Sequence, residues 1–491
     1  MVHVTVIAKV VSDNTGIVAE IPAILTDYGV LMPLVRYVMD IKHVRSASTV
    51  TKLVQSVGLL LDYMEANHDC YDDPKELFAG FVQRLYTGTV SDNGQDPSGL
   101  YWNGRTPSLV RQMVAQLSAF SDWMAEKHGA KPFNPWRQAT HPEEMLAWAA
   151  WHHKRDRAFL AHTWDRNTAS LKMTRARNTL LKRTPIIDHD RAKHFPEERF
   201  HDLIFRGFII PGKQKSSRIE ERLNLRDVLI TLLMHYGGLR MSEPFHLYVH
   251  DVTLDPLRDG SAWVRVYHPS LGQAPSDWLD AKGKPIKCNR DEYLRGKWCM
   301  RPRTEYPASH QWYAGWKNIV VDGSQHFIDV HWFPTWAGEL FWKLWVFYMA
   351  RRAQLQCDHP FAFVTLDGRP YAVDSFQRAH KTAVQRIGLQ AAKALGTSPH
   401  GHRHAYGQRC REANLNPLIT KKAMHHASLE SQVVYTEPPR AAVMRALESA
   451  MQRQQGGEGP LPLPDFLSYG FQDVDPLGLL SGPNPKLIRR G

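Results

Sequence analysis

Apolar and polar residues alternate near the start of the chain with the two-residue period of a β-strand. The pattern runs over residues 2–25 and is interrupted by Asn14-Thr15-Gly16, a sequence that suits a turn. It predicts a small β element, an N-terminal segment 1–30 that caps the next domain or reaches a partner as an arm. The residues on one face of its first strand would be Val4, Val6, Ala8 and Val10.

Between residues 31 and 152 the apolar residues instead recur three and four positions apart, as on an amphipathic helix. Ser48 and Thr49 suit the N-cap of a first helix. Three further helices would begin at prolines, because proline is well tolerated in the first helical turn. The pattern predicts an all-helical domain over 31–152. The prolines are Pro74, Pro107 and Pro142.

Residues 153–199 carry an excess of positive charge. Eleven lysines and arginines face four aspartates between positions 154 and 193, and Pro185 and Pro196 interrupt any long helix. Charged runs usually form a solvated surface or linker. We predict a basic linker between two domains, which would also attract a polyanion.

A larger mixed domain is predicted over residues 200–453. A buried helix follows Asn224 and ends at Gly237-Gly238, because glycine commonly terminates helices. Strands are predicted at 263–267 and 327–332 from their apolar and aromatic residues. The stretch between them, about 268–326, is basic and aromatic, and it either contacts a polyanion or folds as a small subdomain.

The rest of the chain is predicted to be helical and then flexible. Residues 454–491 are rich in glycine and proline and have no sustained period, which indicates a flexible tail. Together the patterns predict a fold that is mainly α with small β elements (α+β), with a helical domain before the larger one. The remaining helices are expected at about 334–355, 374–387 and 441–453.

Composition narrows the class of protein. The chain has 491 residues, enough for two or three domains, and its formal net charge of +12 favours a polyanionic partner, most often nucleic acid. The five cysteines are scattered and form no C-x-x-C pair, which favours a reducing, cytoplasmic compartment without a disulfide framework. Neither a signal peptide nor a membrane span is expected.

Three short strings hold residues that suit a phosphodiester. Arg240 follows the glycine pair at 237–238, and His400 stands three positions before Arg403. His426 precedes Tyr435 by nine positions. Arginine presents a planar fork of donors to phosphate oxygens, and histidine exchanges protons near neutral pH. Tyrosine is one of the side chains that can form a covalent intermediate.

In this order and spacing, the strings resemble the motifs of the tyrosine recombinases of the phage-integrase type. Gly-Gly-Leu-Arg-Met-Ser-Glu, at 237–243, is similar to the family string GLRxSEL. The H-x-x-R group at 400–403 is similar to HxLRH, and His426 with Tyr435 to LGHxxxxxTxxY. The resemblance covers roughly residues 224–437, and it is carried by the strings together, since each alone is weak.

The resemblance implies an enzyme that cleaves and rejoins DNA through a 3′-phosphotyrosyl intermediate. Tyr435 would attack the phosphorus, while Arg240 and Arg403 would hold its non-bridging oxygens. His426 would donate a further hydrogen bond, and His400 would help to remove the tyrosine proton. No metal or other cofactor is implied. The helical domain before residue 152 would be a core-binding domain that clamps the opposite face of the duplex.

The catalytic lysine is harder to assign, because the insert departs from the family pattern. In the family, a β-hairpin carries a lysine that protonates the leaving 5′ oxygen, but here residues 268–326 separate the two strands. Lys317 is our candidate because it lies nearest to the returning strand. A second departure is His425, which stands where the family usually has glycine. The competing lysines are Lys282, Lys284, Lys287 and Lys297.

Three other functions would use some of the same residues. A type IB topoisomerase would relax DNA with much the same site, and a relaxase would pair histidines with a metal and a tyrosine. A catalytically weak DNA-binding protein could also be built on this scaffold. We favour a site-specific integrase of a mobile element. Its expected partners are double-stranded DNA, a homotetramer on paired sites and accessory proteins of the element, with no membrane and a cytoplasmic, nucleoid-associated location.

Overall fold

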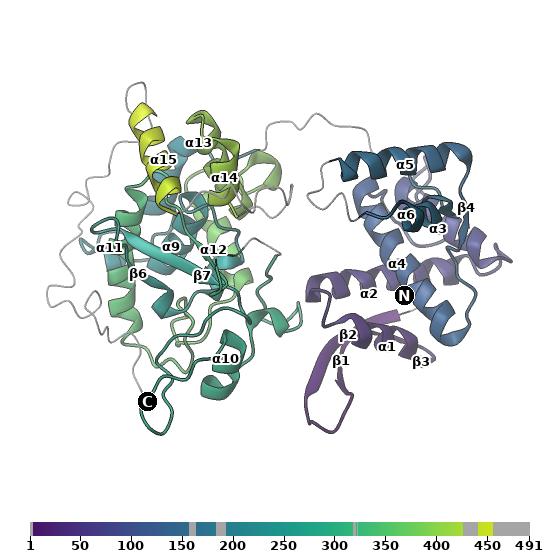
Figure 1. Cartoon of the computed structure of the whole chain (residues 1–491), viewed down its shortest axis with the longest axis horizontal. Helices are drawn as coiled ribbons and strands as arrows, with labels where there is room; N and C mark the ends of the chain where they lie inside the picture. Colours follow the sequence, from purple (N-terminus) through teal and green to yellow (C-terminus); the bar gives the residue numbers. More distant parts are fainter. Residues whose placement is uncertain are drawn as a thin grey trace. The chain divides into compact units, whose positions relative to one another are not determined.

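The computed structural model describes residues 3–156, 164–182, 193–317, 321, 323–425 and 440–454. They divide into two compact units, unit 1 up to residue 182 and unit 2 from residue 193 (Figure 1). Helices dominate both units and the sheets are small and antiparallel, which confirms the predicted mainly α class with small β elements. No helix within the described ranges is long and apolar enough to cross a membrane.

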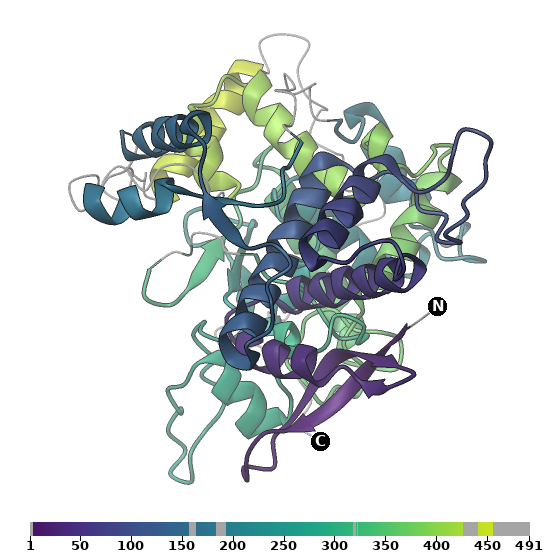
Figure 2. The ribbon, with the colours of Figure 1, turned by 90° about the vertical axis from the view of Figure 1, so that its right-hand side faces the viewer.

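Unit 1 opens with a three-stranded sheet of order β1-β2-β3 that packs on its helices. β1 and β2 pair from His3↔Thr26 to Val11↔Val18, and Figure 2 shows this hairpin against α1 and α2. Ile21, Ala23 and Ile24 of β2 are buried in the same core as the helices, so the described residues 3–30 of the predicted N-terminal segment are an integral part of this unit. The first elements are β1 (His3–Val11), β2 (Val18–Thr26), β3 (Gly29–Val30), α1 (Met32–Ile41) and α2 (Ala47–Ala66).

The predicted helices of unit 1 are present, with one shifted start. The N-cap of α2 is Ser46, whose side chain accepts a hydrogen bond from the Thr49 amide at 3.3 Å, and the predicted cap at Ser48 and Thr49 was therefore wrong. Helices α3 and α4 begin at the predicted prolines. The remaining elements are α3 (Pro74–Thr87), α4 (Pro107–His128), β4 (Trp136–Gln138), α5 (His141–Arg155), α6 (Arg166–Met173) and β5 (Arg175–Arg177).

Part of the basic stretch that we expected to be a linker belongs to unit 1. Strand β5 pairs with β4, and the Arg177 guanidinium forms an ion pair with Asp122 of α4. The same guanidinium lies over the Trp136 ring, 3.8 Å from its centroid. These contacts hold residues 175–177 in the unit, which the local charge pattern did not reveal.

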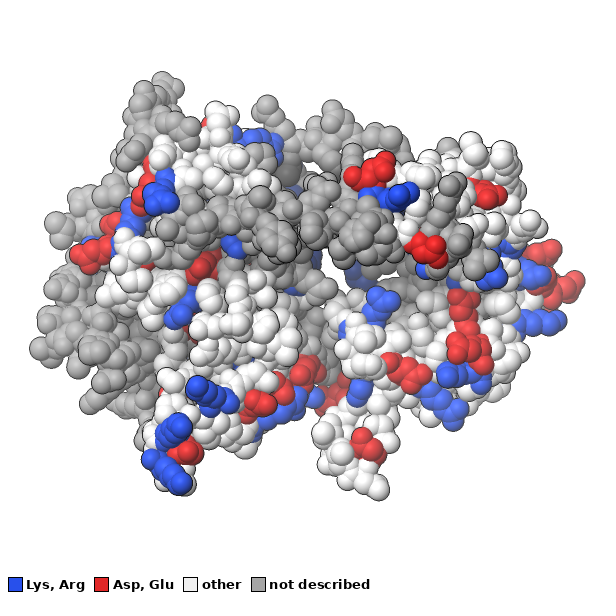
Figure 3. Space-filling model, viewed as in Figure 1, with Lys and Arg blue, Asp and Glu red and all other residues white. Residues whose placement is uncertain are grey.

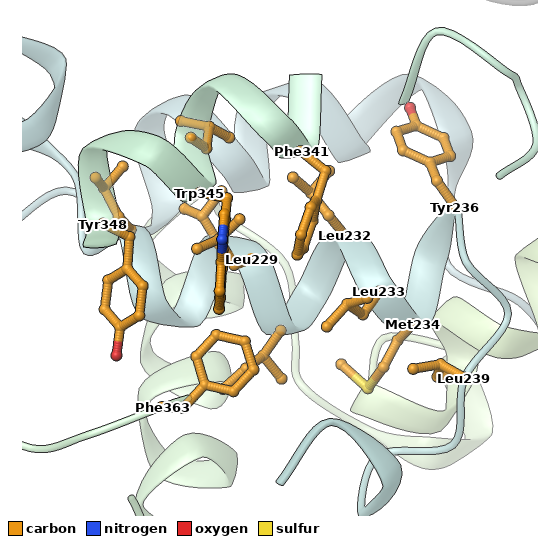
Figure 4. Close-up of a cluster of buried hydrophobic side chains, with 14 of the residues drawn as sticks. Leu229, Leu232, Leu233, Met234, Tyr236, Leu239, Phe341, Trp345, Tyr348 and Phe363 are labelled. Carbon is orange, nitrogen blue, oxygen red and sulfur yellow. The ribbon is translucent and has the colours of Figure 1, made fainter. Parts of the chain in front are cut away.

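Unit 2 is built around helix α9 (Leu225–His235), which is buried on nearly all sides. Figure 4 shows Leu229, Leu232 and Leu233 of α9 packed against Phe341 and Trp345 of α11. Helix α13 contacts α9 as well. The helices and turns of this unit are η2 (Glu197–Arg199), α7 (Phe200–Asp202), η3 (Leu203–Gly207), α8 (Ile219–Arg222), α9, η4 (Glu243–His246), η5 (Val249–Asp251), α10 (Arg290–Trp298), η6 (Arg303–Glu305), α11 (Ala337–Arg352), α12 (Val373–Arg386), η7 (Lys393–Leu395), α13 (Pro399–Glu412), α14 (Pro417–Ala423) and α15 (Arg440–Gln454).

A three-stranded antiparallel sheet of order β6-β7-β8 lies beside these helices. Strands β6 (Val252–Leu254), β7 (Ala262–Tyr267) and β8 (Phe327–Asp329) include both predicted strands, although β8 ends three residues earlier than expected. Strand β7 pairs with β8 from Arg265↔Asp329 to Tyr267↔Phe327, so the insert 268–326 is the connection of a β-hairpin. It contains helix α10 and folds against the rest of unit 2.

Candidate active site

Two glycines at the end of α9 set the position of Arg240. A Cβ on Gly237 would lie 2.6 Å from Val330 Cγ1 and 2.7 Å from the Leu233 carbonyl oxygen. Gly238 has φ +68°, and a Cβ there would lie 3.0 Å from Tyr406 Cδ1. Both positions therefore exclude larger side chains, one by close approach and the other mainly by backbone conformation. The chain can thus turn sharply and present Arg240 directly after the helix.

Glu243 holds the Arg240 side chain in place. Its carboxylate accepts hydrogen bonds from Arg240 Nη1 at 2.8 Å and from the Arg240 backbone amide at 2.7 Å. Glu243 is buried, whereas the Arg240 side chain is 18% exposed. No hydrogen bond from Arg240 Nε or Nη2 to a described residue is present, so these donors can reach a ligand. The Glu243 pair orients the guanidinium and leaves part of it available.

Arg403 joins the same site from helix α13. Its guanidinium is buried and donates hydrogen bonds to the carbonyl oxygens of Gly238 and Met424. Burial lowers the Arg403 pKa to about 10, with Arg240 lowering and Glu243 raising it. Arg403 is therefore still a cation at neutral pH. The two arginines lie near one another and near one carboxylate, although 163 positions separate them in the chain.

His400 stands one helical turn before Arg403 on α13. Its ring centroid lies 4.5 Å from that of His404. Burial lowers the His400 pKa to about 4, and the charges of His404, Arg403 and Lys317 make smaller contributions in the same direction. The imidazole is therefore neutral at pH 7 and can accept a proton. Because Lys317 contributes to this shift, the structure brings it into the electrostatic range of His400.

Lys317 follows a segment that is fixed to the core of unit 2. The Ala314 amide donates to the Arg303 carbonyl at 3.2 Å, and the His246 imidazole lies 3.3 Å from the Gly315 carbonyl oxygen. Lys317 itself is exposed. Of its predicted competitors, Lys297 forms an ion pair of 2.8 Å with Asp277. This placement favours Lys317 as the lysine of the site, and its role remains a prediction.

His426 and Tyr435, the remaining predicted catalytic residues, lie outside the described residues. The neighbouring His425 is described, with φ +52°, a left-handed conformation that glycine adopts most easily. This conformation gives a physical reason for the glycine that the family string has at this position. The His425 ring is buried and stacks on that of His331, with centroids 6.0 Å apart and planes inclined by 23°.

His425 is also closer to the site than the sequence indicated. Burial, followed by the charges of His331, Arg403, Lys422 and Arg240, lowers its pKa well below the usual range. From the sequence, His425 was only a departure from the glycine of the family string, and His331 was not a candidate. His331 lay within the strand predicted at 327–332, and nothing in the local sequence indicated its contact with His425, because more than 90 positions separate the two residues.

A chain of buried histidines fastens α13 to its neighbours. His402 Nδ1 lies 3.1 Å from His235 Nδ1 of α9, and His402 Nε2 lies 2.7 Å from His380 Nε2 of α12. At the other end, Arg409 donates to Glu197 Oε2 at 2.6 Å and lies 3.0 Å from His235 Nε2. Burial lowers the pKa of His235 to about 4 and that of His380 to about 3, so both rings are neutral.

The described part of the site therefore presents two cationic guanidinium groups beside one buried carboxylate, and a neutral imidazole within electrostatic range of Arg403 and of a lysine. Such a set can bind an anionic phosphorus centre and exchange protons with it. Among residues 3–425 and 440–454, apart from the gaps given above, no group of three or more histidine, cysteine or acidic residues is arranged to hold a metal ion.

Solved structures similar to this chain include site-specific recombinases and integrases. One is XerH site-specific recombinase bound to palindromic difH substrate in a post-cleavage complex (TM-score 0.42, 11% identity, 83% of this chain and 78% of that chain). Others are the integrase from mycobacterium phage Brujita (0.29, 12%, 90% and 97%) and the Tn1549 transposon integrase with transposon right end DNA (0.30, 13%, 81% and 99%).

These neighbours are of the same class of protein that the sequence motifs resemble. No family model matches the chain, and no curated protein matches its sequence.

Proposed function

We propose that the chain is a site-specific DNA recombinase or integrase of a mobile element. The observation that carries this proposal is that Arg240, from the turn after α9, and Arg403, from α13, lie beside the same carboxylate, that of Glu243. Two arginine forks can grip the two non-bridging oxygens of one phosphodiester and stabilise the charge that spreads over them during substitution. His400 stands in the same string as Arg403, and His426 and Tyr435 follow in a third string, in the order and spacing of the tyrosine recombinases.

The proposed reaction exchanges one phosphoester bond for another. The Tyr435 phenol oxygen attacks the phosphorus, its proton passes to His400, and the bond from phosphorus to the 5′ oxygen breaks. Lys317 supplies the proton that the leaving 5′ oxygen takes up. The product is a 3′-phosphotyrosyl bond and a free 5′ hydroxyl. Attack by the 5′ hydroxyl of a second duplex reverses these steps and joins new partners, with no net oxidation and no hydrolysis.

A type IB topoisomerase would use the same chemistry on one duplex, so the test must detect joining between sites. A supercoiled plasmid would carry two copies of the site, taken from the ends of the DNA segment that encodes the protein. We expect wild type to yield deletion or inversion products and Tyr435→Phe to yield none. Relaxed plasmid without rearranged products would instead favour the topoisomerase. Binding of the site without either product would favour the DNA-binding scaffold.

This function implies further properties that we propose with it. The protein would act as a tetramer on paired DNA sites in the cytoplasm, and helical unit 1 would bind the duplex beside the catalytic unit. Sedimentation of the protein with and without the paired sites tests the assembly. A tetramer that forms only with DNA is expected, and a particle containing one or two subunits on paired sites would contradict it.

A further inference from the structure

The insert between β7 and β8 contains an exposed, positively charged hairpin, residues 279–287, which we call the arm. We propose that the arm contacts the phosphate backbone of double-stranded DNA away from the reacting phosphate. This inference rests on the proposed function, because it assigns to the insert a share of the DNA binding. It is carried by the anchoring of the insert, the burial of its aromatic residues and the unpaired lysines of the arm.

Two buried arginines anchor the insert to the core of unit 2. Arg290 forms a two-pronged ion pair with Asp251, with distances of 2.9 and 2.5 Å, and both side chains are at most 2% exposed. Arg303 donates to the carbonyl oxygens of Phe245 at 3.1 Å and Tyr371 at 2.7 Å. Bonds of this kind in a dry interior are costly to break, because each would leave a buried polar group unpaired. The base of the insert is therefore held firmly.

The aromatic residues of the insert are used for packing. Tyr293 and Leu294 of α10 are buried against Tyr248 and Phe361, and Trp278 and Trp298 pack on the same cluster. A Cβ on Gly296 would lie 2.1 Å from Trp278, which shows how closely that ring covers α10. These aromatic residues therefore pack against the core of unit 2, which favours the folded alternative of the two drawn from the sequence. Stacking on bases is not available to the buried Tyr293 ring.

The arm itself is a hairpin with a fixed turn. Leu279 pairs with Pro285, and the Asp280 carboxylate accepts hydrogen bonds from the backbone amides of Lys282 at 2.8 Å and Lys284 at 2.9 Å. Gly283 completes the turn with φ +76°. Figures 1 and 2 show the hairpin beside α10, extending beyond that helix. The lysines are thus presented on an ordered backbone.

Lys282, Lys284 and Lys287 are the cationic side chains of the arm, and they can contact a partner. All three are exposed, and none forms an ion pair with a described residue. By contrast, Lys297 is paired with Asp277 and Arg295 with Asp291, both at 2.8 Å. The arm holds three lysines and one aspartate, which gives a net charge of +2. On the face seen in Figure 3, lysine and arginine side chains lie at the tip that extends from the lower end of unit 2, with acidic side chains beside them.

An ordered cationic hairpin on a rigid base fits the regular row of charges along a duplex. Each lysine that neutralises a phosphate releases bound counterions. It therefore adds about 0.9 to the steepness with which the logarithm of the binding constant falls against the logarithm of the salt concentration. Lysine acts there as a point charge without base specificity. The arm is therefore expected to add affinity to any duplex sequence.

The test compares the full chain with Lys282→Ser/Lys284→Ser/Lys287→Ser and with the charge-preserving control Lys282→Arg/Lys284→Arg/Lys287→Arg. Binding to a duplex of unrelated sequence is measured by fluorescence anisotropy from low to physiological salt. In a plot of the logarithm of the binding constant against the logarithm of the salt concentration, the slope of the serine variant should be shallower than that of wild type by about 1 to 3. The arginine variant should keep the wild-type slope. Thermal melting shows whether both variants fold, which is expected because all three positions are exposed.

The possible results separate the inference about the arm from the proposed function. A serine variant that folds and keeps the full slope would overturn the inference about the arm. A serine variant that binds DNA as wild type does but no longer cleaves it would also overturn the inference about the arm. One of the three lysines would then be the proton donor to the leaving 5′ oxygen. If wild type itself does not bind duplex DNA, the proposed function fails, and the arm loses its partner with it.

Discussion

Arg403 donates a hydrogen bond to the carbonyl oxygen of Gly238, two residues before Arg240. The bond joins the H-x-x-R string on α13 to the turn that follows α9. It shows how two strings that are weak signals alone become one site, because one arginine fixes the backbone that presents the other. The left-handed conformation of Gly238, with φ +68°, is a condition for this arrangement.

The first prediction concerns this turn. Gly238→Ala should lower the free energy of unfolding by more than the cost of about 1–2 kcal/mol for a left-handed residue, because its Cβ also meets the Tyr406 ring at 3.0 Å. Gly212→Ala is the matched control, since Gly212 has φ +80° and no atom within 4 Å of the added Cβ. Urea unfolding of both variants measures the difference. Equal losses would mean that the Tyr406 contact is relieved without cost.

A second prediction follows from the left-handed backbone of His425. In an ordinary helix position glycine is less stable than alanine by about 1 kcal/mol. At φ +52° the order should reverse, so that His425→Gly is more stable than His425→Ala by about 1 kcal/mol. Both variants lose the same buried ring, so their comparison isolates the backbone. Lys381→Gly and Lys381→Ala, at an exposed position of α12, should show the ordinary order in the same unfolding assay.

The buried histidine chain predicts that the protein loses stability in mild acid. The folded-state pKa values of His235 and His380 are about 4 and about 3, below the ordinary value of 6.5. The unfolded chain therefore binds more protons below pH 6.5, and stability is lost as the pH falls from 6.5 toward 4. Each such histidine contributes a slope of about 1.4 kcal/mol per pH unit.

A matched pair of variants separates this effect from ordinary loss of packing. His380→Phe removes one titrating ring, so its unfolding free energy should depend less steeply on pH by about 1.4 kcal/mol per unit between pH 6 and 4.5. Phe376→Leu changes a buried residue whose ring lies 5.9 Å from His380. It should lower stability by a similar amount at every pH. Parallel pH profiles for wild type and His380→Phe would refute the assignment of His380 as a neutral ring.

Local signals in the sequence predicted the elements of the fold well. Prolines mark the starts of α3 and α4, and β-branched and aromatic residues mark β7, because these preferences act over a few neighbouring residues. The sequence did not predict that β5 forms within the basic stretch, because that strand depends on β4 and on the ion pair of Arg177 with Asp122. Tertiary contacts of this kind override local charge patterns.

The residues of the candidate site were likewise predictable only where neighbouring positions in the sequence indicate them. The strings predicted Arg240, His400 and Arg403 as site residues, and the structure places these three residues in one region. Spacing could not reveal the histidine chain, since His235 and His402 meet across 167 positions. The choice of Lys317 is also supported by the fold. Lys317 lies toward the far end of a 59-residue insert, yet its charge acts on the His400 imidazole.

The proposed role of Lys317 can be tested by changing the leaving group. Lys317→Ala should slow cleavage of ordinary DNA, because the departing 5′ oxygen then lacks a proton donor. Replacing that oxygen with sulfur should restore the rate, since a thiolate is a far weaker base and leaves without a proton. Lys297→Ala is the control, because Lys297 is paired with Asp277. A Lys317→Ala defect that sulfur does not repair would assign this lysine to binding or structure instead.

The most direct test of the central claim is covalent trapping on a nicked suicide DNA substrate in EDTA, with wild type beside Tyr435→Phe. The substrate would come from the ends of the DNA segment that encodes the protein. The account predicts an adduct with wild type only, joined through a 3′ phosphate and leaving a free 5′ hydroxyl. An adduct that persists in Tyr435→Phe, or one joined through a 5′ phosphate, would contradict it.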